Sequence, residues 1–253
     1  MTGSTERATS FGAIAADYDR LRPSPPPDAV RWLLPADCCV AVDLGAGTGL
    51  LTRALAGGAG NIVAVEPDTR MATLLRARSP GVHVMSGRGE AIPLKDQCAD
   101  ALLVSSAWHW MSPELAVPEI ARVLRDGGRF GVIWTSRDRA VSWVRDLDWL
   151  REPTAGSEPP LRRRHDVRLP DPGLFTDVRE TSFGFIRPMT IDDLVGMLAT
   201  YSGLITAGEA ERSDALARLK AGLVARFGEA DEIDVPMRSL CWRADRSKRG
   251  PGG

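Results

Sequence analysis

The segment Val42-Asp43-Leu44-Gly45-Ala46-Gly47-Thr48-Gly49-Leu50-Leu51-Thr52 decides the fold of this chain. A short apolar run ends in an acid, three glycines follow at alternate positions, and a helix-compatible segment comes next. This order predicts a strand that runs into a tight glycine turn and then into a helix. In such a turn, backbone N–H groups can approach a nucleotide-like ligand.

The spacing of the glycines distinguishes two kinds of ligand loop. A dinucleotide-binding loop has the pattern G-x-G-x-x-G, and its third glycine would fall at Leu50. The pattern present is D-L-G-x-G-x-G, which resembles motif I of the class I S-adenosylmethionine-dependent methyltransferases. In that family the loop wraps the methionine end of the cofactor. Gly45, Ala46 and Gly47 can offer N–H groups to a carboxylate, although an ordinary strand-to-helix turn would look the same.

Strands and helices alternate around this loop. We expect strands at 39–43, 61–66, 82–86, 99–105 and 130–135, with helices at 50–57, 67–77 and 113–125. The glycine-containing stretch 125–129 is expected to stop the last helix before the fifth strand. This rhythm predicts an α/β fold with a doubly wound, mostly parallel sheet.

The rhythm changes beyond residue 138. A helix at 142–151 precedes a stretch rich in proline and arginine (152–172), and then come a strand at 175–187, helices at 190–201 and 209–227, and a strand at 233–243. These strands would complete a seven-stranded sheet with a small helical cap. Two short helices, 11–18 and 28–34, come before the first strand. We expect one domain over 11–246 (core 36–137, cap and C-terminal strands 138–246), and disorder at 1–10 and 247–253.

The composition narrows the possible partners. The net charge is −1, so no overall field favours nucleic acid or a membrane surface, and a small molecule is the simplest partner. The four cysteines form no C-x-x-C pair, which indicates a cytoplasmic protein. No run of residues is apolar enough to suggest a leader or a membrane span. We expect no bound metal, and a monomer or homodimer.

An acid follows the second expected strand. Glu66 stands about 20 residues after the glycine turn and precedes Pro67, a position from which a carboxylate accepts hydrogen bonds from ribose hydroxyls. The alternative is that Glu66 only favours the dipole of the following helix. The separation of the two features favours a ligand, although NAD also contains ribose.

A third segment follows the third strand. Gly87-Arg88-Gly89-Glu90-Ala91-Ile92-Pro93-Leu94 resembles the G-D-A-E-x-L-P segment of these methyltransferases. Arg88 stands where the family usually has an aspartate for the adenine amino group. The resemblance therefore implies backbone contacts from Gly89 and Glu90 to the adenine edge.

The fourth segment, Ser105-Ser106-Ala107-Trp108-His109-Trp110, follows the fourth strand. It resembles the A-x-H-W signature of the type 11 subgroup, which includes trans-aconitate methyltransferase-like enzymes. Phe11…Tyr18-Asp19…Arg22-Pro23 and Glu119–Gly128 add to the resemblance, with Asp126 replacing the usual proline of L-x-P-G-G. The resemblance implies that Tyr18 closes over the cofactor.

His109 is the candidate catalytic residue. A histidine at the ligand end of the sheet can take a proton from a hydroxyl or ammonium acceptor, or orient that acceptor. Alternatively, His109 is structural and packs between Trp108 and Trp110. The expected S-adenosylmethionine-binding set comprises Tyr18, Asp43, Gly45, Ala46, Gly47, Glu66, Pro67, Met71, Arg88, Gly89, Glu90 and Ser105.

Three functions stay open. The first is methyl transfer from S-adenosylmethionine to oxygen, nitrogen or carbon of a small molecule, such as a carboxylate or a natural-product intermediate. The second is an NAD-dependent oxidoreductase, but Leu50 replaces its third glycine. A short-chain version would also need Tyr-x-x-x-Lys, whereas Tyr18 is followed by Arg22 and Tyr201 by Ile205. The third is a non-catalytic binding protein with the same fold.

Overall fold

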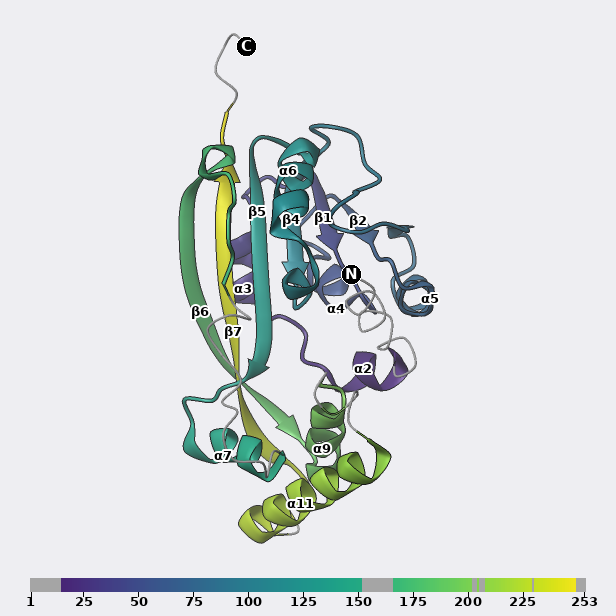
Figure 1. Ribbon diagram of the computed structural model, residues 1–253, viewed down its shortest axis with the longest axis vertical. Helices are drawn as coiled ribbons and strands as arrows, with labels where there is room; N and C mark the ends of the chain where they lie inside the picture. Colours follow the sequence, from purple (N-terminus) through teal and green to yellow (C-terminus); the bar gives the residue numbers. More distant parts are fainter. Residues whose placement is uncertain (1–14, 152–165, 202–203, 205–207, 229, 249–253) are drawn as a thin grey trace.

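The computed structural model describes residues 15–151, 166–201, 204, 208–228 and 230–248. Seven strands form one sheet in the order β3-β2-β1-β4-β5-β7-β6 (Figure 1). Strands β1 to β5 are parallel, and β7 pairs antiparallel with both β5 and β6. The strands are β1 Val40–Leu44, β2 Asn61–Val65, β3 His83–Met85, β4 Ala99–Ser105, β5 Leu124–Arg137, β6 Phe175–Met189 and β7 Ile233–Arg246. The predicted α/β fold with a mostly parallel seven-stranded sheet is confirmed.

Helices cover both faces of the sheet, α6 on one and α3 and α4 on the other, and further helices lie beyond one edge. The helices are α2 Ala15–Leu21, α3 Pro27–Leu33, α4 Leu50–Ala54, α5 Thr69–Arg78, α6 Pro113–Val123, α7 Ser142–Arg151, α9 Ile191–Ala199 and α11 Glu209–Phe227, with 3₁₀ turns η2 Trp108–Trp110 and η3 Pro172–Leu174. None of the helices within the described part of the chain combines the length and apolarity needed to cross a membrane.

Alternation of side chains along the strands builds two cores. Val42 and Phe130 lie in the cluster that includes α6, whereas Ala41 and Ile133 lie in the cluster that includes α3 and α4. Because successive strand residues point to opposite faces, apolar residues at nearly every position bury the parallel strands on both sides. The carboxyl ends of these strands are thereby held at one edge of the sheet.

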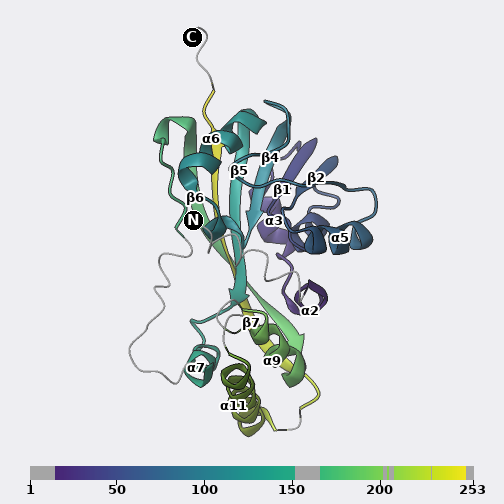
Figure 2. The ribbon, with the colours of Figure 1, turned by 45° about the vertical axis from the view of Figure 1, so that its right-hand side comes forward.

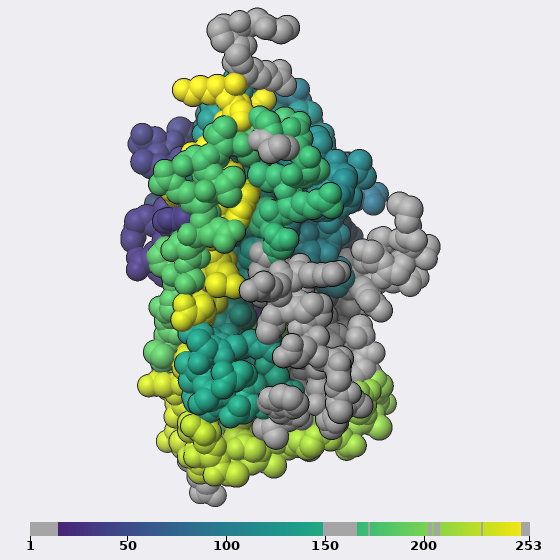
Figure 3. All heavy atoms as spheres, turned by 60° about the vertical axis from the view of Figure 1, so that its left-hand side comes forward, coloured from purple at the N-terminus to yellow at the C-terminus, as the bar shows by residue number. Residues whose placement is uncertain are grey.

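The helical cap lies beyond that edge. β6 and β7 continue past the parallel strands, and α7, α9 and α11 gather at their far end, with α2 between the cap and the sheet (Figures 1 and 2). Leu147 of α7, Leu194 of α9, Leu219 of α11 and Val235 of β7 share one apolar cluster, which also contains Leu21 of α2. Figure 3 shows α7 and α11 together at one end of the molecule, and β6 is the edge strand of the sheet. The cap therefore faces the carboxyl ends of β1 to β5.

One expectation for the core is wrong. The stretch 125–129 was expected to separate the last core helix from the fifth strand, but β5 begins at Leu124, directly after α6. Pairing with β4 shifts register between Ala99 and Ala101, and Gly127 takes a positive φ of 77°. The glycines thus form an irregularity within the strand, because only residues without a Cβ fit this backbone path.

The ends of the chain differ in smaller ways from the expectation. The first described helix, α2, runs to Leu21 instead of ending near Asp19, and residues 11–14 of the expected helix lie outside the described residues. The expected disordered segment 1–10 and residues 249–253 also lie outside them. Ser247, expected to belong to the disordered tail, donates its N–H to the Leu174 carbonyl at 2.9 Å.

Candidate functional site

The glycine loop joins β1 to α4 and contains three residues with left-handed backbone. Gly45, Gly47 and Gly49 have φ values of 71°, 56° and 88°. A Cβ on Gly45 would lie 2.8 Å from the Ala107 Cβ, whereas a Cβ on Gly47 would meet no atom within 4 Å. The loop therefore touches the loop after β4 at Gly45 and has open space at Gly47.

The amides of this loop are already used within the protein. Gly45 and Ala46 both donate their N–H groups to the Val65 carbonyl, at 2.8 and 3.1 Å. This differs from the expectation that these two groups are free for a ligand carboxylate. The reason is the parallel pairing of Leu44 with Val65, which the chain continues for two residues beyond β1.

Glu66 connects the glycine loop to the end of β2. One carboxylate oxygen accepts the Gly47 N–H at 2.8 Å, and the other accepts the Asp68 N–H at 2.8 Å. The side chain is only 7% exposed, and this burial raises the pKa of Glu66. Each oxygen keeps a second lone pair, so the carboxylate can also accept hydroxyl groups at this edge.

Asp43 is completely buried at the end of β1. Its Oδ2 accepts the Thr52 hydroxyl of α4 at 2.5 Å, and its Oδ1 has no hydrogen-bond partner among the described residues. Burial, and to a smaller extent the nearby charge of Glu66, raise the pKa of Asp43 to about 7 against the opposing effect of the Thr52 hydrogen bond. The Thr48 hydroxyl of the glycine loop is also buried without such a partner.

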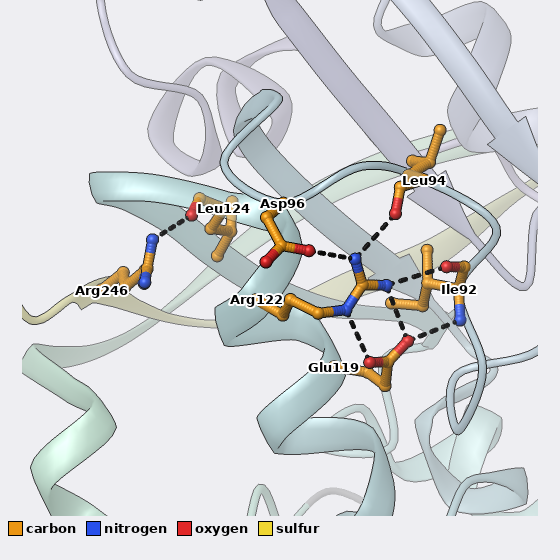
Figure 4. A network of polar contacts seen from close by, with 7 residues as sticks. All are labelled: Ile92, Leu94, Asp96, Glu119, Arg122, Leu124 and Arg246. Carbon is orange, nitrogen blue, oxygen red and sulfur yellow. Dashed lines mark hydrogen bonds and ion pairs between the residues drawn. The ribbon is translucent and has the colours of Figure 1, made fainter.

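Arg122 of α6 holds the segment after β3 in place through hydrogen bonds to its backbone (Figure 4). Arg122 donates to the carbonyls of Ile92 and Leu94, at 3.0 and 2.8 Å. It also forms ion pairs with Asp96 and Glu119, and Glu119 accepts the Ile92 N–H at 2.9 Å. The hydrogen bonds from Arg122 lower the pKa of Glu119, so this pair stays charged. The network fixes residues 92–96 against α6.

Gly89 and Glu90 lie in the part of this segment that faces the glycine loop. A Cβ on Gly89 would lie 2.6 Å from the Met111 sulfur, and the same methionine is 3.4 Å from the position of a Cβ on Gly45. Met111 thus brings together the loops after β1, β3 and β4. The Glu90 carboxylate accepts the Ser112 N–H at 2.8 Å. Its side chain therefore holds the start of α6 against this segment.

The chain turns sharply after Ser105, the last residue of β4. Ser106 has a positive φ of 54°, a costly conformation for a residue with a Cβ, and it donates its N–H to the Ile133 carbonyl. The turn sends Trp108 into the core, where it is 3% exposed and packs against Phe130. His109 is exposed, with its ring 4.6 Å from that of Trp110. The ring of His109 thus packs beside that of Trp110.

The N-terminal helix is joined to the glycine loop through one ion pair. Asp19 of α2 pairs with Arg53 of α4 at 2.5 Å, and Arg53 donates to the Thr48 carbonyl at 2.8 Å. Tyr18 is half-buried one residue away, with the Arg22 guanidinium 5.0 Å from its ring centroid. α2 therefore lies over the start of α4.

The remaining expected site residues differ in exposure. Pro67 and Arg88 are exposed, whereas Met71 is 4% exposed in the first turn of α5. Sequence reasoning did not find Thr52 and Arg53, because their partners Asp43 and Asp19 lie far away in sequence or on another element. Among the residues that the structure describes, no group of three or more His, Cys, Asp or Glu could hold a metal ion.

This constellation fits a nucleoside-containing cofactor. A buried carboxylate for hydroxyl groups, open space at Gly47 and an unpaired buried oxygen on Asp43 all lie at the carboxyl edge of β1 and β2. Open α/β sheets bind their ligands at this edge, where the strand order reverses between β1 and β4.

Comparison with known proteins agrees with this arrangement. The chain matches the family described as "Methyltransferase domain" over residues 42–132. An uncharacterized methyltransferase of Mycobacterium tuberculosis is 39% identical over 241 residues, which cover 94% of this chain and 96% of the relative. A malonyl-[acyl-carrier protein] O-methyltransferase of Herminiimonas arsenicoxydans is 32% identical over 123 residues, 47% of each protein.

The fold has close counterparts among solved structures. A structure from Anaeromyxobacter dehalogenans, described as a type II methyltransferase, has a TM-score of 0.66 at 24% identity. It covers 91% of this chain, and 99% of that protein is matched. Because the 39% identical relative spans almost the entire chain and the matched domain contains the glycine loop, this protein belongs to the class I S-adenosylmethionine-dependent methyltransferases.

Proposed function

We propose that this protein binds S-adenosylmethionine at the edge formed by Gly47, Glu66 and Gly89 and transfers its methyl group to a small molecule. The observation that carries the proposal is the buried Glu66 carboxylate, which is bonded to the Gly47 N–H and retains lone pairs for ribose hydroxyls. When bound, the cofactor supplies a methyl group on a sulfonium, which is already activated for displacement.

The protein itself has to align the acceptor and exclude water. The loops after β1, β3 and β4 meet at Met111, which fixes the relative positions of the groups around the cofactor. α2 and the cap lie beyond these loops (Figure 2), on the side from which an acceptor would approach. Little covalent chemistry is then left to the side chains.

His109 is the residue that we assign to the acceptor. It is exposed on η2, directly after β4, and an imidazole ring is the side-chain group that most often takes up or gives off a proton in enzymes. For a hydroxyl or ammonium acceptor it takes up the proton that the acceptor loses. For a carboxylate acceptor no proton has to be removed, and His109 donates a hydrogen bond instead.

The acceptor is proposed to be a small molecule methylated at oxygen, nitrogen or carbon. The relative from Herminiimonas arsenicoxydans is a malonyl-[acyl-carrier protein] O-methyltransferase, which supports a carboxylate carried on a small acyl group. We also propose that the protein acts in the cytoplasm, because its four cysteines are free thiols.

The test is calorimetric titration with S-adenosylmethionine, S-adenosylhomocysteine and NAD. We expect the first two to bind and NAD not to bind. Glu66→Gln should weaken S-adenosylhomocysteine at least tenfold, because an amide group would replace one of two accepting oxygens. Glu114→Gln, at an exposed carboxylate of α6, is the matched control and should bind like wild type. Tight NAD binding without a response to the other two ligands would contradict the proposal.

A further inference from the structure

A pocket of about 420 Å³ lies between α2, the start of α4 and β6. Its lining includes four arginines, Arg20, Arg22, Arg53 and Arg187, together with Asp19 and Phe185. None of the residues expected to bind the cofactor lines it. The concentration of guanidinium groups is a local property, since the net charge of the whole chain is only −1.

Two of these arginines are neutralised and two are not. Arg53 pairs with Asp19 at 2.5 Å, and Arg20 pairs with Asp193 at 2.6 Å. Within the described part of the chain, no carboxylate lies within ion-pair distance of Arg22 or Arg187. The four arginines of the pocket therefore exceed their ion-paired carboxylates by two, and Asp193 acts on Arg187 only from beyond ion-pair distance.

The two unneutralised guanidiniums are held in place by neutral groups. Arg22 donates to the Thr200 hydroxyl at 2.8 Å and to the Thr200 carbonyl at 2.9 Å, and it lies 3.9 Å from the ring centroid of Tyr201. Arg187 donates to the Leu21 carbonyl at 2.6 Å and to the Arg20 carbonyl at 3.3 Å.

These contacts orient the two groups without cancelling their charge. Both side chains are half-buried, and desolvation lowers the pKa of Arg187. Keeping two such cations without a counter-ion costs free energy, which a bound anion would recover. A planar guanidinium fixed in this way suits a carboxylate or phosphate, since it offers several donors in one plane.

We propose that this pocket binds an anionic group of the methyl acceptor, a carboxylate or a phosphate, between Arg22 and Arg187. This inference rests on the proposed function and adds the class of acceptor to it. Leu50 and Phe185 supply apolar walls for the carbon skeleton next to the charged groups. The volume is within the range of small-molecule sites. The pocket is lined by β6 and lies on the side of the sheet edge that faces the cap. This position favours the methyl acceptor, and not the carboxylate of the cofactor, as the occupant of the pocket.

The test is calorimetric titration of malonate and of inorganic phosphate, each with and without saturating S-adenosylhomocysteine. The proteins are wild type, Arg187→Gln, Arg22→Gln and the control Arg31→Gln, which changes an exposed arginine of α3 paired with Asp28. We expect at least one of the two anions to bind wild type. Both pocket variants should bind that anion at least tenfold more weakly than wild type, and the control variant should bind it as wild type does. The preferred anion identifies carboxylate or phosphate as the group that is recognised.

The affinity for S-adenosylhomocysteine separates the two proposals. We expect it to change less than twofold in Arg187→Gln. Malonate that displaces S-adenosylhomocysteine, together with weakened S-adenosylhomocysteine binding in Arg187→Gln, would assign the pocket to the cofactor and overturn the inference. Equal anion binding by wild type and both pocket variants, or no anion binding by wild type, would also overturn it.

Failure of wild type to bind S-adenosylhomocysteine would count against the proposed function alone, since the anion titrations are also run without that ligand. Arg187 supports two backbone carbonyls, so each variant is first checked for folding by circular dichroism. If Arg187→Gln does not fold, Arg187→Lys replaces it in the anion titrations. It keeps the charge but loses the planar fork, and the inference requires it to bind the anion more weakly than wild type does.

Discussion

The Glu66 carboxylate accepts the N–H of Gly47 at 2.8 Å, across the gap between the end of β2 and the loop after β1. The same carboxylate accepts the Asp68 N–H, so one side chain fixes both the glycine loop and the start of α5. A ribose that shares this carboxylate would therefore be held against a loop that is already in position.

Gly47 and Gly45 form a matched pair, because both have positive φ but different surroundings. Gly47→Ala is expected to cost about 1–2 kcal/mol of stability, from the left-handed backbone alone. Its new methyl group would occupy the open space at the loop, so S-adenosylhomocysteine should bind more than tenfold more weakly. Calorimetry and urea unfolding measure the two effects.

Gly45→Ala is the comparison for Gly47→Ala. Its methyl group would lie 2.8 Å from the Ala107 Cβ, which adds crowding of roughly 1–3 kcal/mol to the backbone cost. The variant should therefore be clearly less stable than Gly47→Ala. Equal stability of the two variants, or unchanged ligand binding by Gly47→Ala, would show that the loop is arranged differently.

Asp43 should make stability depend on pH. Burial raises its pKa to about 7 in the folded protein, whereas an unfolded aspartate titrates near pH ~4. Between these values the folded state binds the proton more tightly, so the free energy of unfolding falls as the pH rises and the loss is complete above about 7.

Asp43→Asn removes this titration. Relative to wild type, the variant should gain roughly 2–3 kcal/mol of stability between pH 5 and pH 8, from about 1.4 kcal/mol per pKa unit. Urea unfolding at several pH values gives the difference. A difference that is independent of pH would mean that Asp43 is ionised throughout.

The Asp19–Arg53 ion pair should matter more than an exposed one. The Asp19 side chain is 9% exposed and that of Arg53 is 31% exposed. Asp19→Asn leaves Arg53 without its ion-pair partner in a pocket that contains three other arginines, and should cost roughly 2–4 kcal/mol. Asp28→Asn breaks a pair of similar length on the surface and should cost about 0.5 kcal/mol or less. Similar costs would indicate that α2 is not held by this contact.

His109 should affect turnover without affecting the fold. Its side chain is exposed, so His109→Ala and His109→Asn are expected to unfold like wild type. With the true acceptor, a loss of the base should reduce kcat by about 10²–10⁴-fold. His109→Asn should recover part of this loss if the residue only orients the acceptor. Wild-type kcat in both variants would remove His109 from the mechanism.

Local patterns in the sequence predicted most of the fold. The strand at Ala99–Ser105 and the helix at Glu209–Phe227 have the expected bounds, because apolar patterning and flanking turn residues mark them clearly. The prediction that 125–129 separates a helix from a strand was wrong. Glycines can end a helix and can also permit an irregularity within a strand, and only the pairing with β4 decides between the two.

Contacts between distant residues could not be predicted in this way. The Gly45 and Ala46 N–H groups donate to the Val65 carbonyl, and this depends on the register of β1 and β2. The arginine pocket combines Arg22, Arg53 and Arg187 from three elements, and each looks like an ordinary surface arginine in the sequence. The four candidate loops could be placed at one edge of the sheet because each directly follows a strand, and parallel strands end at the same edge.

Met189 and Ile233 lie opposite each other in paired positions of β6 and β7. The intervening chain, with α9 and α11, therefore leaves the sheet and returns to it at a single point. In topological terms, β6 and β7 form a β-hairpin whose connection contains α9 and α11. A turn of a few residues would be enough to close the same hairpin. Because both ends of this connection meet at one residue pair, its length and content can change without shifting the register of β6 and β7.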